Sequence, residues 1–423
     1  MIGNTLARHE ITAPSDRPHD VVVFGATGFT GALVAEYLAD HSAGTGLRWA
    51  IAGRDESRLH AVRVRIAATH PGPGPVAVLV ADSHDPASLN AMAASTKVLC
   101  TTVGPYARHG TPLLEACIAQ ATDVVDLTGE PHFVRHSVDT FHEEAVRAGV
   151  RIVHCCGFDS IPSDLGTRAL QDAVIARDGR PCDEIRLFVV DLRGAVSGGT
   201  IESMVGVMDA ARDPEVRKIL GDPYALNPPG ERHGPDRREP RGPDHDRVTD
   251  TWTAPFVMAA INSRVVRRSN ALLDFAYGRD FRYQEVMATG TGPAGWLRAF
   301  STAAGLGLFL VGMRAGPTRA LLRRWVLPGP GRGPSRERMA AGRFAMRLSG
   351  RRDGTEIGAC IVRGSRDPGY AATAGMIAEA AVHLASDDRT APCPAGVLTP
   401  ATGLGDGITA RLKRAGVEFE IQA

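Results

Sequence analysis

The feature that most constrains this fold is a glycine-rich turn that directly follows a short apolar strand. The segment Asp20–Gly31 reads DVVVFGATGFTG, so a run of valines leads into Gly25, Gly28 and Gly31, where a helix is predicted to begin. The first glycine permits a tight turn, the second lets the backbone approach a pyrophosphate, and the third allows close helix–strand packing. Because a helix N-terminus also offers oriented N–H groups, the segment predicts a dinucleotide site.

Short apolar runs alternate with helical patterns from Asp20 to about Ser163. They are predicted to be strands at Val21–Phe24, Leu47–Ala52, Val76–Val80, Val98–Val103, Val124–Leu127 and Ile152–Cys156. Several are apolar throughout, as is typical of strands buried on both faces of a parallel sheet. The alternation predicts an α/β protein whose first domain, residues 17–165, is a Rossmann-type doubly wound parallel sheet.

The pattern changes further along and predicts an α+β second domain over residues 166–423. Within it, Glu184–Leu192 and Phe256–Val266 are predicted to be strands of a second sheet, and Tyr370–Leu384 an alanine-rich helix. Such apolar runs are typical of strands when they are short and of helices when they are long.

Two segments of the second domain are set apart by composition or position. Residues 221–249 are rich in proline, glycine and charge, which predicts a mobile surface loop. Residues 370–423 either belong to the second domain or pack back on the first.

Composition narrows the function classes. The chain has 48 basic and 47 acidic residues, so its formal net charge of +1 does not indicate a nucleic-acid partner. Its seven cysteines contain no C-x-x-C pair and its 14 histidines show no ligand spacing, so we expect neither a disulfide framework nor a metal site. We expect no secretory signal, because the first residues lack an apolar core, and the cytoplasm is the predicted location.

The residues after the second predicted strand distinguish the two nicotinamide cofactors. An NAD-binding protein commonly has an acidic residue here, which binds the ribose 2′-hydroxyl. This chain has Gly53 and Arg54 instead, and a guanidinium can pair bidentately with a 2′-phosphate. Asp55 argues for NAD, although it comes one residue later, and the alternative for Arg54 is a solvated loop residue. The pattern favours NADP(H).

The residues expected to contact this cofactor come from the glycine-rich turn and from the ends of the second, third and fourth strands. They are Gly25, Thr27, Gly28, Phe29, Thr30, Gly31, Arg54, Asp82, Ser83, Thr102, Val103, Gly104 and Pro105. Doubly wound sheets bind ligands at the carboxyl edge of their strands, where these residues meet. Asp82 and Ser83 are expected near the adenine and Thr102–Pro105 near the nicotinamide. The alternative for these strand ends is ordinary turn chemistry.

Long motifs make a family resemblance visible between about Asp20 and Val417. GATGFTG, IAGR, TTVGPYARHG, DLTGE, CGFDSIPSDLG, RVVRRSNAL, DPGY and GVLTP follow one another in this order. They resemble the saccharopine dehydrogenase-like oxidoreductases, and within that group the actinobacterial trans-acting enoyl reductases. The resemblance implies reduction of a double bond in a polyketide-derived lipid chain, for phthiocerol-type lipids and phenolic glycolipids, and an association with membranes.

Enoyl reduction needs a hydride at one carbon and a proton at the other, and the protein supplies the proton from a side chain or an ordered water. Tyr106 and His109 follow the fourth predicted strand, and Tyr106 is our first candidate for the donor. Asp159 follows the sixth strand and is a third candidate. The alternatives are that Tyr106 packs against its turn, that His109 is solvated, and that the residues around Asp159 cap a helix.

An uncharged segment, Ala299–Met313, is flanked by Trp296 and Trp325 and followed by arginines. It is too short to span a bilayer. It is expected either to lie in the membrane interface, with tryptophan and arginine at the headgroups, or to form a buried helix between domains or subunits.

The sequence thus predicts an NADP(H)-dependent protein, and the resemblance implies a reductase of a hydrophobic small molecule or a carrier-bound acyl chain, involved in complex lipid or glycolipid biosynthesis. One alternative is a non-catalytic NADP-binding membrane scaffold or sensor, and another is an amino-acid dehydrogenase of saccharopine type. The expected location is the cytoplasm. If residues 299–313 lie in the membrane interface and are not buried, the protein would be peripheral at the inner face of the plasma membrane. A homodimer is compatible with the sequence.

Overall fold

The computed structural model divides the chain into two compact units, which are described here one at a time. The first comprises Met1–Phe158 and Gly369–Ala415, and the second comprises Asp159–Pro368 and Gly416–Ala423. The described residues are 17–70, 76–194, 198–237, 239–314, 318–319, 333–386 and 394–422. The first unit therefore combines an N-terminal stretch with a later segment that begins just before the predicted alanine-rich helix.

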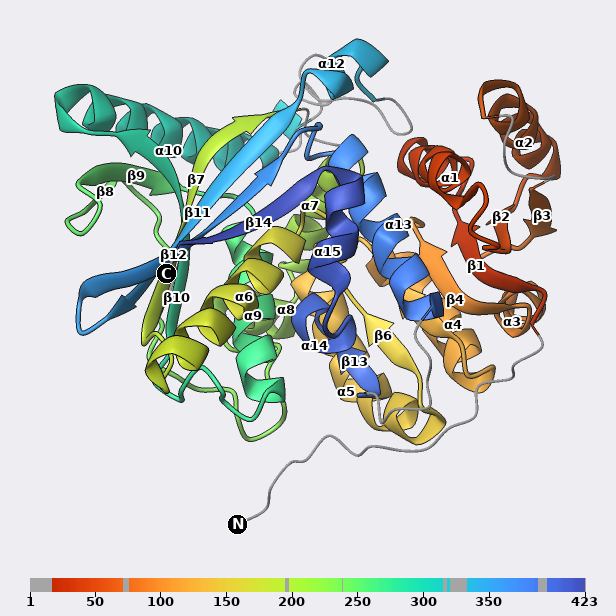
Figure 1. The fold of residues 1–423 in the computed structure, drawn as a ribbon, viewed down its shortest axis with the longest axis horizontal. Coiled ribbons are helices and arrows are strands. Elements are labelled where there is room, and N and C mark those ends of the chain that lie inside the picture. Colours follow the sequence, from red (N-terminus) through yellow and green to blue (C-terminus); the bar gives the residue numbers. More distant parts are fainter. Residues whose placement is uncertain are drawn as a thin grey trace. The chain divides into compact units, whose positions relative to one another are not determined.

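The first unit contains a seven-stranded parallel sheet in the order β13-β6-β5-β4-β1-β2-β3 (Figure 1). Its strands are β1 (His19–Phe24), β2 (Trp49–Gly53), β3 (Ala77–Val80), β4 (Thr96–Thr101), β5 (Asp123–Val125), β6 (Arg151–Val153) and β13 (Gly396–Leu398). The doubly wound sheet predicted from the sequence is confirmed. Each of the six N-terminal strands overlaps its predicted apolar run, and the seventh comes from the GVLTP motif.

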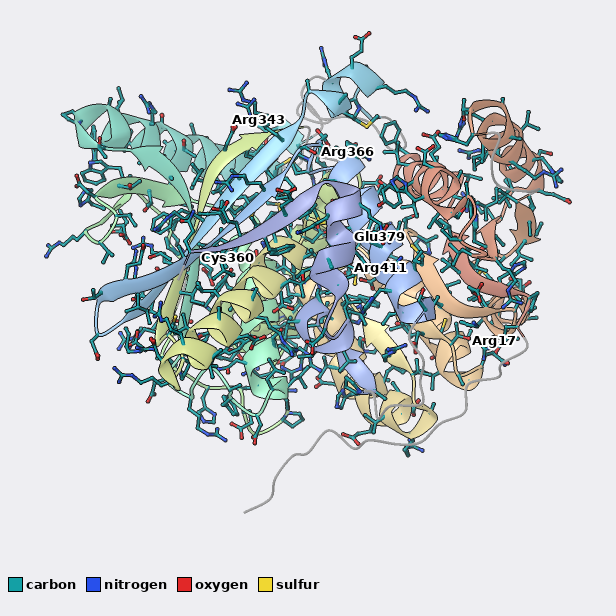
Figure 2. All side chains as sticks on the ribbon, viewed as in Figure 1. Arg17, Arg343, Cys360, Arg366, Glu379 and Arg411 are labelled. Carbon is teal, nitrogen blue, oxygen red and sulfur yellow. The ribbon has the colours of Figure 1, made fainter. Side chains whose placement is uncertain are left out.

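Helices cover this sheet. They are α1 (Phe29–Ser42), α2 (Glu56–Thr69), α3 (Pro86–Ala94), α4 (Tyr106–Ala119), α5 (Pro131–Ala148), α13 (Ala371–Ser386), α14 (Pro400–Gly403) and α15 (Ile408–Leu412), with a 3₁₀ turn at Lys413–Ala415. The small residues of α13 let it lie close against β1, β4 and β5. Glu379 of α13 accepts hydrogen bonds from the Tyr37 hydroxyl (2.8 Å) and from Arg411 of α15 (3.0 Å), and Figure 2 labels Glu379 and Arg411. The bond from Tyr37 holds the later segment on the N-terminal one, and the bond from Arg411 joins α15 to α13 within the later segment.

The second unit contains a mixed seven-stranded sheet in the order β14-β12-β11-β7-β10-β9-β8. Its strands are β7 (Glu184–Arg193), β8 (Asp244–Asp246), β9 (Thr251–Pro255), β10 (Arg282–Gly290), β11 (Arg343–Arg352), β12 (Thr355–Gly364) and β14 (Val417–Gln422). Its helices are α6 (Ile161–Asp178), α7 (Gly198–Ala210), α8 (Pro214–Gly221), α9 (Ala259–Leu272), α10 (Gly292–Arg314) and α12 (Arg336–Ala340). β10 runs parallel to β7, and the other described pairs are antiparallel.

One strand prediction is wrong. Phe256–Val266 was expected to be a strand, but β9 ends at Pro255 and most of the segment lies in α9. Ile261 and Val265 are one helical turn apart and both are buried, so they give the helix an apolar contact surface. The predictions for Glu184–Leu192 and Tyr370–Leu384 are confirmed by β7 and α13.

Residues 221–249, which we expected to form a mobile surface loop, are instead held in place along much of their length. Tyr224 and Leu226 are buried, and Asp236 forms an ion pair with the buried Arg267 of α9 at 2.8 Å. The end of the segment pairs with β9 as strand β8. The composition of the segment indicates an exposed loop. It does not indicate that Arg267, distant in the sequence, forms an ion pair with Asp236.

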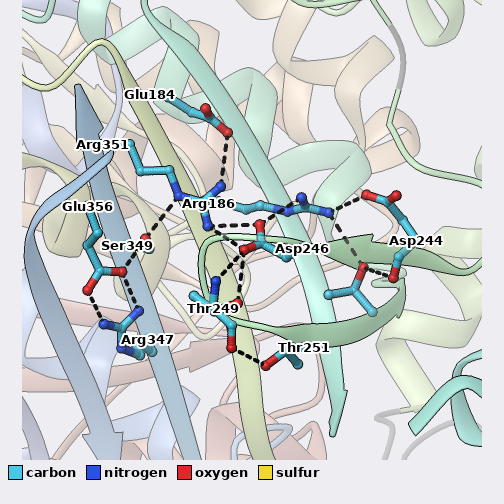
Figure 3. Close-up of polar contacts among 11 residues, drawn as sticks. Glu184, Arg186, Asp244, Asp246, Thr249, Thr251, Arg347, Ser349, Arg351 and Glu356 are labelled. Atoms are coloured by element: carbon cyan, nitrogen blue, oxygen red, sulfur yellow. Dashed lines mark hydrogen bonds and ion pairs between the residues drawn. The ribbon is translucent and has the colours of Figure 1, made fainter. Parts of the chain in front are cut away.

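A buried ion-pair network fixes β8 to the sheet, as Figure 3 shows. The carboxylate of Asp246 accepts hydrogen bonds from Arg186 of β7 (2.9 Å) and from Arg351 of β11 (2.8 Å). Asp244 binds the other terminal nitrogen of Arg186 at 2.8 Å. Each buried charge has an opposite charge and additional hydrogen bonds, as its burial requires.

Glu285 of β10 is a fully buried carboxyl group. One of its oxygens accepts a hydrogen bond from the Tyr283 hydroxyl at 2.8 Å, and the other from the Asn262 amide at 2.9 Å. Burial raises the pKa of Glu285 to about 7, although hydrogen bonds from Ser163, Tyr283 and Asn262 act in the opposite direction. The folded protein therefore favours the protonated form of this carboxyl group.

We predict that the free energy of unfolding contains a contribution from Glu285 that falls as the pH rises. The pKa of this group rises from 4.5 to about 7 on folding, so its favourable contribution is complete below 4.5 and is lost as the pH rises through 7. Glu285→Gln carries no titrating proton, so its stability relative to the wild type should increase between about pH 5 and about pH 8 in urea titrations. Glu56→Gln, on the exposed start of α2, is the control. A Glu285→Gln difference that is constant with pH would contradict this assignment.

Candidate dinucleotide site

The glycine-rich turn has the geometry that the sequence predicted for it. Gly25 has a φ of +94°, and a Cβ added there would lie 2.8 Å from the Thr102 hydroxyl oxygen. A Cβ on Gly31 would lie 2.2 Å from the Gly25 carbonyl oxygen, so the start of α1 crosses the turn at a distance that only glycine allows. Thr102 follows β4, and its hydroxyl donates to the Phe24 carbonyl oxygen at 3.3 Å.

The N-terminus of α1 is open to a ligand. Its N-cap residue, Gly28, is exposed and supplies no side-chain cap, and the first turn of the helix has no acidic residue. Thr27, Phe29 and Thr30 border the same turn and are partly exposed. Unpaired N–H groups and the positive end of the helix dipole favour a phosphate here. The turn therefore fits the pyrophosphate of a dinucleotide.

The structure explains why Asp55 does not oppose the NADP prediction. Asp55 is the N-cap of α2, and its carboxylate accepts a hydrogen bond from the Arg58 backbone N–H at 3.0 Å. Arg54 is exposed directly after β2, and Arg58 donates from its side chain to the Thr27 carbonyl oxygen at 3.1 Å. The acidic residue nearest to the end of β2 is thus used to begin a helix, and the arginine beside it remains accessible to a 2′-phosphate.

The turn after β3 contains Asp82 and Ser83, the residues expected near the adenine. Asp82 accepts hydrogen bonds from the backbone N–H of His84 (2.9 Å) and from its ring (3.0 Å). The Ser83 hydroxyl lies 3.3 Å from Nδ1 of His109 in the first turns of α4. His109, which the sequence suggested as a proton donor, therefore lies in α4 beside the turn that follows β3.

The loop after β4 contains Thr102, Val103, Gly104 and Pro105, which are partly or fully exposed, and its Gly104–Pro105 peptide is cis. Tyr106 begins α4 and is buried. Its hydroxyl donates a hydrogen bond to the Thr101 carbonyl oxygen at 3.2 Å. It also accepts a hydrogen bond from the Leu127 N–H at 3.1 Å. The hydroxyl thus joins the ends of β4 and β5.

Glu130 is a buried carboxylate at the same edge of the sheet. Its two oxygens accept hydrogen bonds from the backbone N–H groups of Tyr106 and Ala107, each at 3.0 Å. It occupies the N-terminus of α4, where the helix dipole favours a negative charge. This position accounts for Glu130 without a catalytic role.

A buried chain of Ser137, His154 and Asp126 is a feature that sequence reasoning missed. His154 Nδ1 lies 2.7 Å from Asp126, and Nε2 lies 2.9 Å from the Ser137 hydroxyl. The order matches that of a hydrolytic triad, but the three residues are at most 2% exposed, so no substrate reaches the serine. Asp126 also accepts from the N–H groups of Thr128 and Cys155, each at 3.1 Å. The cluster positions the loops after β5 and β6.

The sixth strand is shorter than predicted. It was expected to include Cys155 and Cys156, but β6 ends at Val153, and Cys155 adopts a left-handed conformation with a φ of +63°. Both thiols are fully buried, in agreement with a core role. Asp159 is half-buried and begins the second unit, and the next residue, Ser160, is the N-cap of α6. The Ser160 hydroxyl bonds to Asn262 and not to the helix backbone.

A cavity of about 380 Å³ lies at the opposite, amino edge of the first sheet. Its charged lining is largely paired internally: Asp20 binds Arg48 and Lys97, each at 2.9 Å, and Glu379 binds Arg411. It is therefore separate from the glycine-rich turn. Among the residues that the structure describes, no group of three or more His, Cys, Asp or Glu side chains could hold a metal ion.

Comparison with known proteins identifies the family. Residues 21–153 match the saccharopine dehydrogenase NADP binding domain. Trans-acting enoyl reductases of Mycobacterium bovis (strain BCG) and Mycobacterium leprae are 40% and 38% identical over 96% of this chain and 98% of their own. A relative from Mycobacterium tuberculosis is 42% identical over 96% of this chain and 97% of its own.

Among solved structures, apo saccharopine dehydrogenase (L-Glu forming) from Saccharomyces cerevisiae is similar over 96% of this chain and 100% of its own, with 12% identity and a TM-score of 0.49. The sequence relatives span both units of the present chain, and the NADP-binding model covers the glycine-rich turn and the exposed arginine described above. The chain therefore belongs to the trans-acting enoyl reductase family of saccharopine dehydrogenase-like proteins, and it is an NADP-dependent oxidoreductase.

Proposed function

We propose that this protein reduces the carbon–carbon double bond of an α,β-unsaturated acyl chain, either free or bound to a carrier, in the biosynthesis of a complex lipid. The proposal rests on two features of the site, an open glycine-rich turn and an exposed Arg54. They occur in a chain whose relatives are named enoyl reductases. Bound NADPH supplies the hydride in such a reaction. The substrate class rests on the names of the relatives.

The residues of the first unit hold the cofactor and shape the edge of the sheet. Gly25, Gly28 and Gly31 leave room for the pyrophosphate, and Thr102–Pro105 line the strand end where the nicotinamide is expected. Tyr106 holds the ends of β4 and β5 together through its two backbone hydrogen bonds. We therefore assign Tyr106 a positioning role. We propose an ordered water as the source of the proton. Asp159, expected from the sequence as a donor, begins the second unit and is tested by substitution.

Two alternatives have distinct consequences. A non-catalytic NADP-binding scaffold would bind NADPH but would not oxidise it with any enoyl substrate. An amino-acid dehydrogenase would act on a polar substrate and would need arginine and carboxylate groups that converge beside the nicotinamide. The exposed apolar helix α10 favours a hydrophobic substrate over the polar substrate of an amino-acid dehydrogenase, and the NADPH oxidation assay separates the enzyme from the scaffold.

Helix α10 is also the basis of a proposal about location. The described residues contain one helix long and apolar enough to cross a membrane, Gly292–Met313, and only 11% of its apolar window is buried. Leu297, Phe300, Leu308 and Val311 are between 51% and 74% exposed, and their spacing places them on one face of the helix. An exposed apolar stripe of this length marks an interaction surface.

The occupant we propose for this stripe is the interface of an anionic membrane. The described helix has no acidic residue, its charges are arginines, and Trp296 stacks on Phe300 at 5.6 Å near its beginning. Aromatic and basic side chains are typical of helices that lie at the headgroups. Ala299 is fully buried and α10 contacts β9 and β10, so the helix lies against its own sheet and would rest on a bilayer without spanning it. Trp325 lies outside the described residues.

We predict that Tyr106→Phe keeps most of the activity. The variant loses a buried hydroxyl that donates one hydrogen bond and accepts another, so we expect a loss of about 1–3 kcal/mol in stability and a decrease in turnover of less than about tenfold. The measurement is NADPH oxidation with long-chain enoyl thioesters. A decrease of roughly 10²–10⁴ at unchanged NADPH affinity would instead identify Tyr106 as the proton donor. Asp159→Asn is compared in the same assay.

We predict that Leu308→Asp folds normally, binds NADPH as the wild type does, and loses binding to vesicles that contain anionic lipid. Leu308 is 74% exposed, so the new charge stays hydrated in the free protein but would be buried in the bilayer interface. Val64→Asp on α2, at a position 65% exposed, is the matched control. If Leu308→Asp instead leaves vesicle binding intact and changes the sedimentation of the protein, the stripe is an interface between two copies of the chain.

A further inference from the structure

Two histidines meet beside the exposed arginine of the nucleotide site. The rings of His84, after β3, and His109, in α4, lie 5.2 Å apart at an angle of 87°. The Ser83 hydroxyl is 3.3 Å from Nδ1 of His109, which fixes the ring in this place. His109 is partly exposed, so one side of its ring remains accessible to a ligand.

Arg54 belongs to the same group of side chains. The N–H of Ala81 donates to the carbonyl oxygen of Gly53 at 3.0 Å, so the chain leaves β2 and β3 side by side. Arg54 and Asp82 are the next residues in the two turns. Arg54 is also near enough to His109 to act on it electrostatically.

The acidic residues of these turns are already engaged. Asp55 caps α2 through the Arg58 N–H, and Asp85 caps α3 through the Ala87 N–H. Asp82 is held by two hydrogen bonds from His84. Among the described residues Arg54 therefore forms no ion pair, and Asp82 is the acidic side chain near enough to interact with it electrostatically.

The electrostatic environment of His109 disfavours its charged form in the free protein. Burial lowers the pKa of His109, and the positive charges of His84, Arg108 and Arg54 lower it further, while Asp82 raises it. An added dianion beside Arg54 would reverse this balance, because it would stabilise the imidazolium. A phosphate is thus a ligand whose charge would complement Arg54 and a protonated His109.

We propose that His109, together with Arg54, binds the 2′-phosphate of NADP(H), and that His109 takes up a proton when the phosphate binds. The proposal rests on the NADP assignment and not on the enoyl substrate. It places His109 in cofactor selection, in contrast to the catalytic role considered from the sequence. NADH lacks the phosphate and gains nothing from the charged imidazole.

The proposal predicts the direction in which the affinity for NADPH changes with pH. If bound His109 is protonated and free His109 is neutral, the affinity for NADPH rises as the pH falls through the range in which the histidine titrates. The 2′-phosphate itself has a pKa of about 6, and binding to cations favours its dianion, which releases protons. Net proton uptake on binding therefore reports a histidine of this group and not the ligand, and its loss in His109→Gln would assign it to His109 and not to His84.

The test compares His109→Gln with the wild type by calorimetric titration, in two buffers of different ionisation enthalpy at about pH 7. The probes are NADPH and NADH, and then adenosine 2′,5′-bisphosphate and adenosine 5′-monophosphate. His136→Gln, at an exposed position of α5, is the matched control, and Arg54→Ala is the reference for loss of the phosphate contact.

We expect His109→Gln to weaken NADPH and the bisphosphate by about five- to tenfold, to leave NADH and the monophosphate within about twofold, and to abolish proton uptake. Unchanged NADH affinity shows that the variant is folded. The proposal is overturned if the ratio of NADPH to NADH affinity is unchanged, or if all four probes weaken equally, since that result would identify an adenine contact. Because no substrate is present, a failure of the enoyl reductase assay leaves this test unaffected.

Discussion

The close crossing of two backbone segments at Gly25 and Gly31 is the constraint on which the nucleotide site depends. A Cβ on Gly31 would lie 2.2 Å from the Gly25 carbonyl oxygen, so any other residue would force α1 away from β1. The same turn touches Thr102 after β4, which bonds to the Phe24 carbonyl oxygen. The position of the helix N-terminus, and of the loop expected at the nicotinamide, follows from this one contact.

Buried polar groups fix the positions of the other strand ends relative to that turn. Asp126 accepts hydrogen bonds from the loops after β5 and β6, and Glu130 holds the first N–H groups of α4. Tyr106 bridges β4 and β5. Several residues that have the chemistry of catalysts are therefore used to build a rigid edge. A rigid edge serves catalysis, because hydride transfer depends on precise placement of the two reacting carbons.

Much of the first unit was predictable because its signals are local. Six short apolar strands separated by helical patterns specify a doubly wound sheet, and three glycines after the first strand specify the turn. The second unit was harder to predict. The run Phe256–Val266 was predicted to be a strand, but most of it lies in α9, where Ile261 and Val265 share a buried face and Asn262 bonds to Glu285 of β10. Similarly, nothing near Asp236 in the sequence predicts Arg267 as its partner.

The order of residues along the chain was enough to establish the sheet, the glycine turn, the preference for NADP and the family. The roles of individual side chains depend on the tertiary structure. In it, Asp55 caps a helix, the Tyr106 hydroxyl is buried between two strand ends, His109 lies beside Ser83, and Leu308 is exposed on α10. The physical reason is that backbone geometry is set by neighbours in sequence, whereas hydrogen-bond partners and burial are set by residues that only the tertiary structure brings together.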